Sequence, residues 1–173
     1  PRTYMTEVAS CGVYPVNPLA TSICAVPAFA SVEEIPAEID QAIIVVPKEL
    51  VQGVAESCVR KRVPALVVIS AGFREVGAEG LARERRLTEL VRANGMRMVG
   101  PNCMGILNAN PAVSMNGTFA PNLPPYGKVG FVSQSGAMGL SVLDYAREYG
   151  VGISQFVAVG NKSDVSGNGL VLA

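Results

Sequence analysis

Short apolar runs recur along the chain, separated by stretches that mix apolar and polar positions. Runs of roughly four to eight residues, rich in Val and Ile, are typical of parallel β-strands with both faces covered. They predict six strands, at residues 12–16, 42–46, 65–69, 96–99, 129–132 and 153–159.

Helical spacing of apolar residues separates several of these runs. It predicts helices at residues 50–61, 79–94 and 137–149, and Asn94-Gly95 has the composition of a helix C-cap. One face of the first helix carries Leu50, Val51, Val54, Ala55, Cys58 and Val59. The alternation of strand and helix predicts an α/β fold with a doubly wound sheet.

The pattern lapses between residues 108 and 126, where Asn, Pro and Gly indicate turns and a linker. A new strand–turn–helix unit begins at Gly127. We therefore predict a first domain over residues 1–122 and the start of a second over residues 123–173. The first domain is expected to lack the opening strand and Gly-rich turn of nucleotide-binding α/β domains. The second is expected to continue beyond Ala173.

The composition argues against several classes of function. The chain has 14 basic and 14 acidic residues and no Lys/Arg block, which argues against a nucleic-acid or anionic-membrane surface. No apolar run approaches the roughly 20 residues of a membrane helix. Four cysteines without a C-x-x-C pair indicate free thiols in a reducing cytoplasm. The absence of His excludes a His-based metal site or a Ser–His pair within this chain, and no metal ligands are assigned here.

Small and polar residues follow all six predicted strands. Carboxyl ends of parallel strands share one edge of a sheet, where ligands bind, so six such loops suit an extended ligand with phosphates. The clearest is the turn Ser133-Gln134-Ser135-Gly136, which links a strand to a helix. Unpaired N–H groups and the helix dipole at such a turn favour an oxyanion.

An ordered set of motifs gives these loops a family resemblance. V-Y-P-V-N-P, I-I-V-V-P, V-V-I-S-A-G-F, G-P-N-C-x-G-I-L-N, G-x-V-G-F-V-S-Q-S-G-A and V-G-N-K-S-D follow one another along nearly the whole chain. The set resembles the NDP-forming (ADP-forming) acyl-CoA synthetases, relatives of the succinyl-CoA synthetase α subunit and of ADP-forming acetate–CoA ligases. The resemblance implies a Rossmann-like CoA-binding domain followed by the start of a flavodoxin-like domain.

The same resemblance implies a cytoplasmic acid–CoA ligase. It would join a carboxylic acid to CoA while ATP becomes ADP and phosphate, through acyl-phosphate and phosphohistidine intermediates. The phosphorylated histidine is expected beyond Ala173, so no catalytic residue is assigned here and this chain alone is expected to be inactive. ATP or ADP and Mg²⁺ would bind an ATP-grasp domain or subunit, and an oligomer is expected.

The family motifs also imply two sets of site residues. Those expected to bind CoA are Asn17, Pro18, Pro47, Lys48, Ser70, Ala71, Gly72, Phe73, Pro101, Asn102 and Cys103. Those expected to bind phosphate are Ser133, Gln134, Ser135, Gly136 and Ala137.

Several of these residues have an alternative interpretation. Lys48 could neutralise a CoA phosphate or be a solvated lysine, and Leu19 stands where many relatives have another lysine. Phe73 could fill the core, and Cys103 is best explained as a small residue near the site. The acidic and basic residues between 74 and 86 are expected to form a solvated face. Asn161, Lys162 and Asp164 could either contact phosphate or shape the turn.

Two rival functions belong to other classes. The same domains occur as a CoA- or acyl-CoA-sensing regulatory module of a protein-lysine acetyltransferase. An NAD-binding redox domain is the second rival, although G-x-G-x-x-G does not follow the first predicted strand. The sequence leaves the carboxylic acid open.

Overall fold

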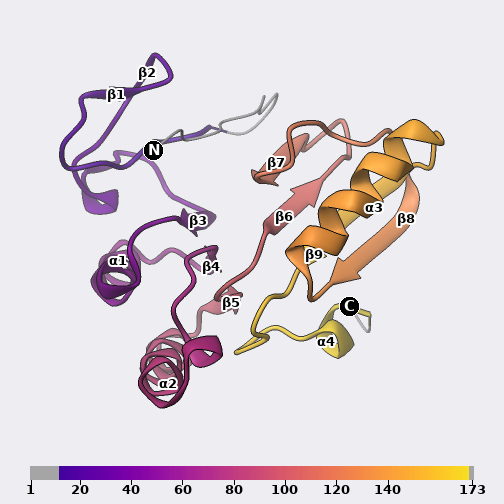
Figure 1. The fold of residues 1–173 in the computed structure, drawn as a ribbon. Coiled ribbons are helices and arrows are strands. Elements are labelled where there is room, and N and C mark those ends of the chain that lie inside the picture. Colours follow the sequence, from indigo (N-terminus) through magenta and orange to yellow (C-terminus); the bar gives the residue numbers. More distant parts are fainter. Residues whose placement is uncertain (1–11, 172–173) are drawn as a thin grey trace.

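The computed structural model describes residues 12–171, which form a small hairpin and two larger adjoining sheets flanked by helices (Figure 1). The first sheet is parallel, in the order β3 (Gln41–Ile44), β4 (Ala65–Val68) and β5 (Arg97–Val99). Helices α1 (Lys48–Lys61) and α2 (Ala78–Ala93) connect these strands and pack against each other. The predicted β-α-β-α-β unit is therefore present, with both helices beside this sheet.

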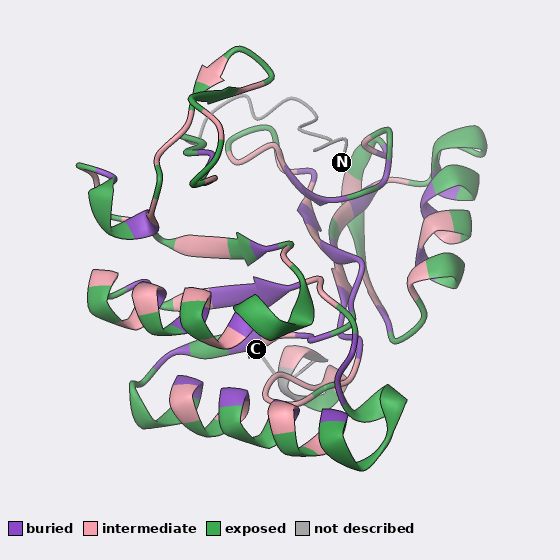
Figure 2. Cartoon of the chain, turned by 60° about the vertical axis from the view of Figure 1, so that its left-hand side comes forward, coloured by how far each residue is buried: buried purple, intermediate pink, exposed green. Residues whose placement is uncertain are grey.

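The first core lies between this sheet and its helices. Helix α1 buries Val51, Ala55 and Cys58, and α2 buries Leu87 and Val91, all at helical spacing. The 3-10 helix η1 (Val32–Glu34) packs against α1. Figure 2 shows the result: the helices are exposed on their outer sides and buried toward the sheet.

The second sheet has four strands in the order β7 (Met115–Thr118), β6 (Gly105–Asn108), β9 (Ile153–Ala158) and β8 (Tyr126–Ser133). Strands β8 and β9 are parallel, whereas β6 is antiparallel to both of its neighbours. Helix α3 (Gly136–Glu148) packs on β8 and β9, and the rings of Phe131 and Phe156 stack with centroids 5.5 Å apart. The sheet thus combines β6, which precedes residues 109–125, with β7 inside this stretch and with β8 and β9, which follow it.

The two cores adjoin through β4. Val67, on the face of β4 opposite the first core, is 1% exposed and packs with Met104 and Leu107. Helix α4 (Gly167–Val171) follows the loop after β9. None of the helices in the described range 12–171 has the length and apolar character needed to cross a membrane.

Three predictions about strands were wrong. No strand was predicted at residues 105–108, which form β6. Residues 12–16 do not form a strand: Val16 makes an isolated bridge to Phe29, and a small hairpin of β1 (Ser22–Ile23) and β2 (Val26–Pro27) follows. Residues 115–118, predicted as part of a turn-rich stretch, form β7. Asn116 and Thr118 are buried there because their side chains hydrogen-bond each other, with 2.7 Å between Asn116 Oδ1 and Thr118 Oγ1.

Candidate functional site

Three predicted CoA loops meet at the carboxyl edge of the first sheet. The Ser70 hydroxyl donates to the Val46 carbonyl at 2.6 Å and accepts the Val46 N–H at 3.1 Å. The Asn102 N–H donates to the Ser70 carbonyl at 3.0 Å. The loops after β3, β4 and β5 are therefore connected in series, which brings together Pro47, Lys48, Ser70, Ala71, Gly72, Phe73, Pro101, Asn102 and Cys103.

The loop after β5 depends on close backbone packing. Gly100 has φ 97°, and a Cβ at this position would lie 2.4 Å from the Val68 carbonyl oxygen. Asn102 adopts a left-handed conformation with φ 55°, and the peptide between Gly100 and Pro101 is cis. Any side chain at position 100 would overlap the Val68 carbonyl, so glycine is required where the loop passes the end of β4.

Lys48 lies at the start of α1 and reaches over the loop after β4. Its side chain is 43% exposed and its ammonium lies 3.3 Å from Glu49 Oε1. The stem of Lys48 covers Gly72. In the described structure no side chain caps this helix, because Pro47 occupies the N-cap. A cation and the positive end of the α1 dipole therefore lie at one point of the edge, while the solvated interpretation of Lys48 stays open.

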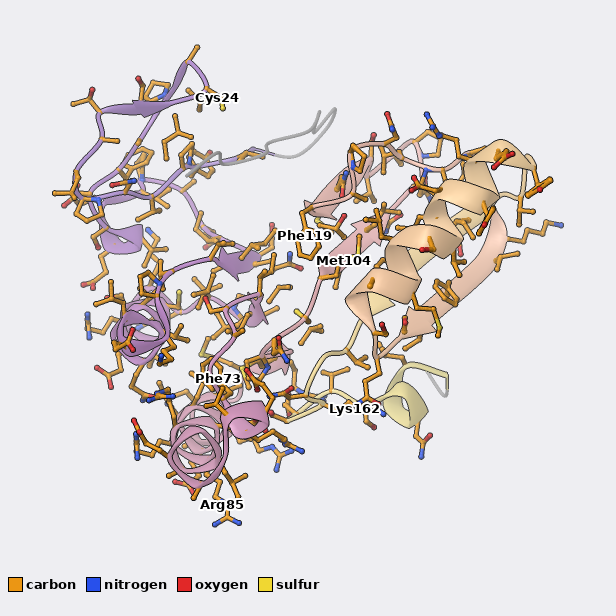
Figure 3. All side chains as sticks on the ribbon, viewed as in Figure 1. Cys24, Phe73, Arg85, Met104, Phe119 and Lys162 are labelled. Atoms are coloured by element: carbon orange, nitrogen blue, oxygen red, sulfur yellow. The ribbon has the colours of Figure 1, made fainter. Side chains whose placement is uncertain are left out.

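Two predicted CoA residues turn their side chains into the protein. Phe73 is fully buried in the first core, so only its backbone is available to a ligand (Figure 3). The Cys103 thiol donates to the Val68 carbonyl at 3.3 Å, and burial raises its pKa to about 11. The thiol is thus neutral near pH 7, in agreement with the view of Cys103 as a small packing residue rather than a nucleophile.

The predicted phosphate turn joins β8 to α3. The buried Ser133 hydroxyl donates to the Ser135 carbonyl at 2.8 Å, and Ser135 Oγ accepts the Met138 N–H at 3.3 Å as the N-cap of α3. Gln134 and Ala137 are exposed. A Cβ on Gly136 would lie 3.3 Å from Met104 Cβ, so this turn packs beside the loop after β5. Met104, which the sequence did not single out, connects the two predicted subsites.

Asn17 and Pro18 lie in a different part of the molecule. Asn17 Oδ1 accepts the Leu19 N–H at 2.9 Å, and the Asn17 N–H donates to the Phe29 carbonyl at 2.9 Å. Leu19 itself is 95% exposed. These contacts place both residues with the N-terminal hairpin, and none of them links that segment to the connected loops described above.

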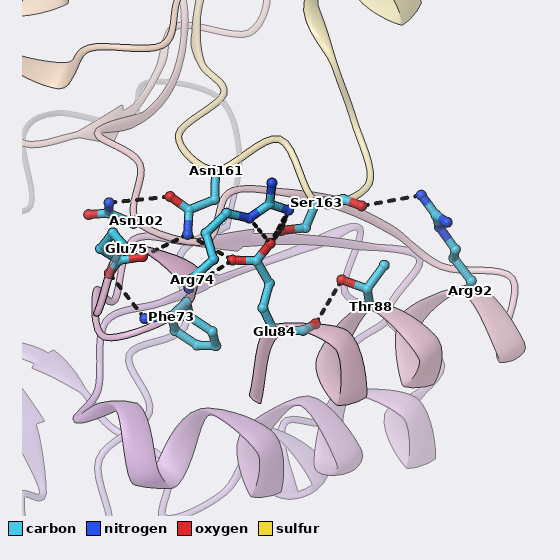
Figure 4. A network of polar contacts seen from close by, with 9 residues as sticks. All are labelled: Phe73, Arg74, Glu75, Glu84, Thr88, Arg92, Asn102, Asn161 and Ser163. Carbon is cyan, nitrogen blue, oxygen red and sulfur yellow. Dashed lines mark hydrogen bonds and ion pairs between the residues drawn. The ribbon is translucent and has the colours of Figure 1, made fainter. Parts of the chain in front are cut away.

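The predicted solvated face at residues 74–86 is wrong for Arg83, whose side chain is 14% exposed and donates to the Gly72 carbonyl, and for Glu84. The Glu84 side chain is only 2% exposed and pairs with Arg74 (Figure 4). It also accepts hydrogen bonds from Ser163 and from Asn161 Nδ2, the latter at 2.8 Å. Burial alone would raise the pKa of Glu84, but these hydrogen bonds outweigh burial and hold the pKa below its ordinary value. Arg85 and Arg86 are exposed, as predicted.

The loop after β9 is attached to β5 by Asp164. This carboxylate, 5% exposed, lies 3.1 Å from Arg92 Nε and 2.9 Å from Arg97 Nε, and accepts the Met98 N–H at 2.9 Å. Burial opposes ionisation of Asp164, yet the hydrogen bonds from Arg97, Met98 and Arg92 lower its pKa. Asp164 therefore shapes the turn from within the protein, while Lys162 is exposed (Figure 3).

Two family models match the chain. A CoA binding domain matches residues 2–109, and a succinyl-CoA ligase like flavodoxin domain matches residues 126–173. The chain is 47% identical over 151 residues to acetate–CoA ligase [ADP-forming] I of Archaeoglobus fulgidus, covering 87% of this chain and 22% of the relative. It is 43% identical to the α subunit of acetate–CoA ligase [ADP-forming] II of Pyrococcus furiosus, covering 88% of this chain and 33% of the relative.

A solved structure shows the same arrangement. It is the dinucleotide forming acetyl-coenzyme A synthetase 1 of Ca. Korarchaeum cryptofilum in complex with phosphate and ADP, with a TM-score of 0.85 and 37% identity. The match covers 91% of this chain and 33% of that one. The chain thus spans about a fifth to a third of the length of these relatives. It belongs to the CoA binding domain family, in the arrangement with a succinyl-CoA ligase like flavodoxin domain that marks the ADP-forming acyl-CoA synthetases.

Proposed function

We propose that this chain supplies CoA binding and part of a phosphate site to an ADP-forming acyl-CoA synthetase. The observation that carries the proposal is the single connected edge. Ser70 and Asn102 join the loops after β3, β4 and β5, and Met104 packs against the turn that begins α3. An extended thioester carrier with a phosphorylated end fits such an edge, and a phosphoryl group fits the turn.

The proposed roles of the residues follow from their chemistry. Lys48 and the positive end of the α1 dipole would hold an anionic phosphate of CoA, while the backbones of residues 70–73 and 101–103 would line its path. The N–H groups at the start of α3, beside Ser133 and Ser135, would stabilise a phosphoryl group carried by a histidine. That histidine must come from outside these 173 residues, which contain none.

The complete reaction needs further parts. In the proposed enzyme an ATP-grasp domain or subunit binds ADP or ATP with Mg²⁺, and the assembly is an oligomer that works in the cytoplasm. The α subunit named among the relatives supports a partner subunit, and the complex with phosphate and ADP supports these ligands.

Turnover in the reverse direction tests this function. The chain, assembled with an ATP-grasp partner, is given an acyl-CoA, ADP and phosphate, and ATP and free CoA are measured. We expect equal amounts of both, with no ATP when phosphate is omitted. Labelled ATP should leave an acid-labile, base-stable phosphorylated protein. CoA binding without turnover or phosphorylation would instead favour an acyl-CoA sensor, and binding of NADH in place of CoA would favour a redox domain.

A further inference from the structure

One amide side chain in the loop after β9 contacts both loops that are predicted to bind CoA. The side-chain oxygen Oδ1 of Asn161 accepts from Asn102 Nδ2 at 3.4 Å, and the backbone N–H of Asn161 donates to the Pro101 carbonyl at 2.9 Å. Asn161 Nδ2 donates to Glu75 Oε2 and to Glu84 Oε2, both at 2.8 Å (Figure 4). Each hydrogen of the amide group therefore has its own carboxylate partner.

Glu75 carries this contact on to the loop after β4. Its second oxygen, Oε1, accepts the N–H of Gly72 at 2.5 Å and the N–H of Phe73 at 3.0 Å. Burial by itself would raise the pKa of Glu75, but the hydrogen bonds from Asn161, Gly72 and Phe73 lower it. The ionised carboxylate is thus a bridge between the Asn161 side chain and the backbone of residues 72–73.

The chemistry of the amide matters as well as its position. Asn161 is neutral and donates to two carboxylates, one of which, Glu84, is almost completely buried. A carboxylate at position 161 would place a third negative charge among them, and an alanine would leave both without this donor. Among the protein side chains, asparagine combines two donor hydrogens, one acceptor and no charge at this reach.

From these contacts, and resting on the proposed function, we propose that Asn161 is a positioning residue. Through it, the loop after β9 holds residues 70–73 and 100–103 in a single arrangement for CoA. The same loop leaves β9 next to Ser133, because the Val159 N–H donates to the Ser133 carbonyl at 2.9 Å. Asn161 therefore couples the predicted CoA edge to the predicted phosphate turn.

The test compares Asn161→Ala with Asn122→Ala, an exposed asparagine in the linker, by amide hydrogen exchange and by CoA titration of the assembled enzyme. We expect Asn161→Ala to speed exchange at the Gly72 and Phe73 amides and to weaken CoA binding, each about tenfold. Asn161→Asp should weaken binding further at neutral pH. Asn122→Ala should change neither quantity. Unchanged exchange and CoA affinity in Asn161→Ala would overturn the proposal.

A second variant guards against a general loss of folding. In Glu75→Gln the amide oxygen still accepts from Gly72 and Phe73, but the amide nitrogen faces the nitrogen of Asn161. It should reproduce the effect of Asn161→Ala on CoA affinity, and the double variant should add little to either change. Full additivity would contradict the bridge. If the parent enzyme takes up no CoA, the proposed function fails, whereas exchange at Gly72 and Phe73 still decides whether Asn161 holds the loop.

Discussion

Two helical glycines, Gly53 in α1 and Gly80 in α2, lie in opposite surroundings. A Cβ on Gly53 would meet nothing within 4 Å, whereas a Cβ on Gly80 would lie 1.8 Å from the Phe73 carbonyl oxygen. Gly80 therefore allows α2 to pack directly against the backbone of the loop after β4. The same residue type is a weakness of the helix in one place and a requirement of the site in the other.

These surroundings predict opposite signs for the same substitution. Gly53→Ala should raise the free energy of unfolding by about 0.5–1 kcal/mol, because alanine has the higher helix propensity. Gly80→Ala should lower it by roughly 1–3 kcal/mol, because the methyl group overlaps rigid backbone. Urea unfolding of both variants measures the difference. Stabilisation by Gly80→Ala would contradict direct packing of α2 against the Phe73 carbonyl.

Lys48 provides the sharpest test of a single residue in CoA binding. Lys48→Ala removes a half-exposed cation at the start of α1, and we expect CoA affinity to fall about tenfold, the effect of one charge-assisted contact. Lys128→Ala, which removes an exposed lysine from β8, is the matched control. Calorimetry on the assembled enzyme measures both. Equal CoA affinity in the parent and in Lys48→Ala would leave Lys48 as a solvated lysine.

At the scale of elements, hydrophobic periodicity predicted the strands and helices whose positions depend on the local sequence. The cores of β3, β4, β5, β8 and β9 and the three long helices lie where it placed them. Strand β4 buries three consecutive apolar residues and each helix buries an apolar stripe, whereas β8 leaves Val129 47% exposed, so the expected cover on both faces is absent there. Strand β7 was missed because Met-Asn-Gly-Thr has no apolar alternation and is ordered by side-chain hydrogen bonds.

In the candidate site, too, some features could be predicted from the local sequence and others could not. The Gly- and Ser-rich turns mark the strand ends in the sequence, so their positions could be predicted from it. The burial of Glu84 could not, because its partners Asn161 and Ser163 are 77 and 79 residues away and come together only in the folded chain. Nothing in the sequence of residues 74–86 distinguishes Glu84 from the exposed Glu79, Arg85 and Arg86.

The attachment of the loop after β9 predicts a dependence of stability on pH. Glu75, Glu84 and Asp164 have lowered pKa values in the folded protein, so their contribution is complete above the ordinary carboxyl range and is lost as pH falls through the lower folded values. Unfolding free energy should therefore fall steeply between about pH 5 and pH 3.

Glu84→Gln should reduce that slope. It should also cost roughly 2 kcal/mol at pH 7, because the buried pair with Arg74 loses its charge. Urea unfolding at a series of pH values and constant ionic strength measures both effects. Glu89→Gln, an exposed change on the same helix, serves as the control. Parallel pH curves for the parent and Glu84→Gln would contradict a stabilising role for the ionised carboxylate.

At the scale of the whole molecule, two cores and their sheets place the predicted CoA edge beside the predicted phosphate turn. The cores meet at β4, and β6 carries the chain from the end of the first sheet into the second. Loops from both parts are joined by Asn161 and Asp164. In the proposed function, a CoA that extends along the first sheet would end near the start of α3, as transfer between a thioester carrier and a phosphoryl group requires.

Calorimetric titration with CoA, compared with NADH, tests that central relation most directly. For the chain assembled with its ATP-grasp partner, we predict saturable binding of one CoA per chain and no heat from NADH. The 173-residue chain alone should bind CoA more weakly. Binding of NADH with CoA excluded, or the absence of CoA binding by the assembled enzyme, would contradict the assignment of the β3-β4-β5 edge to CoA.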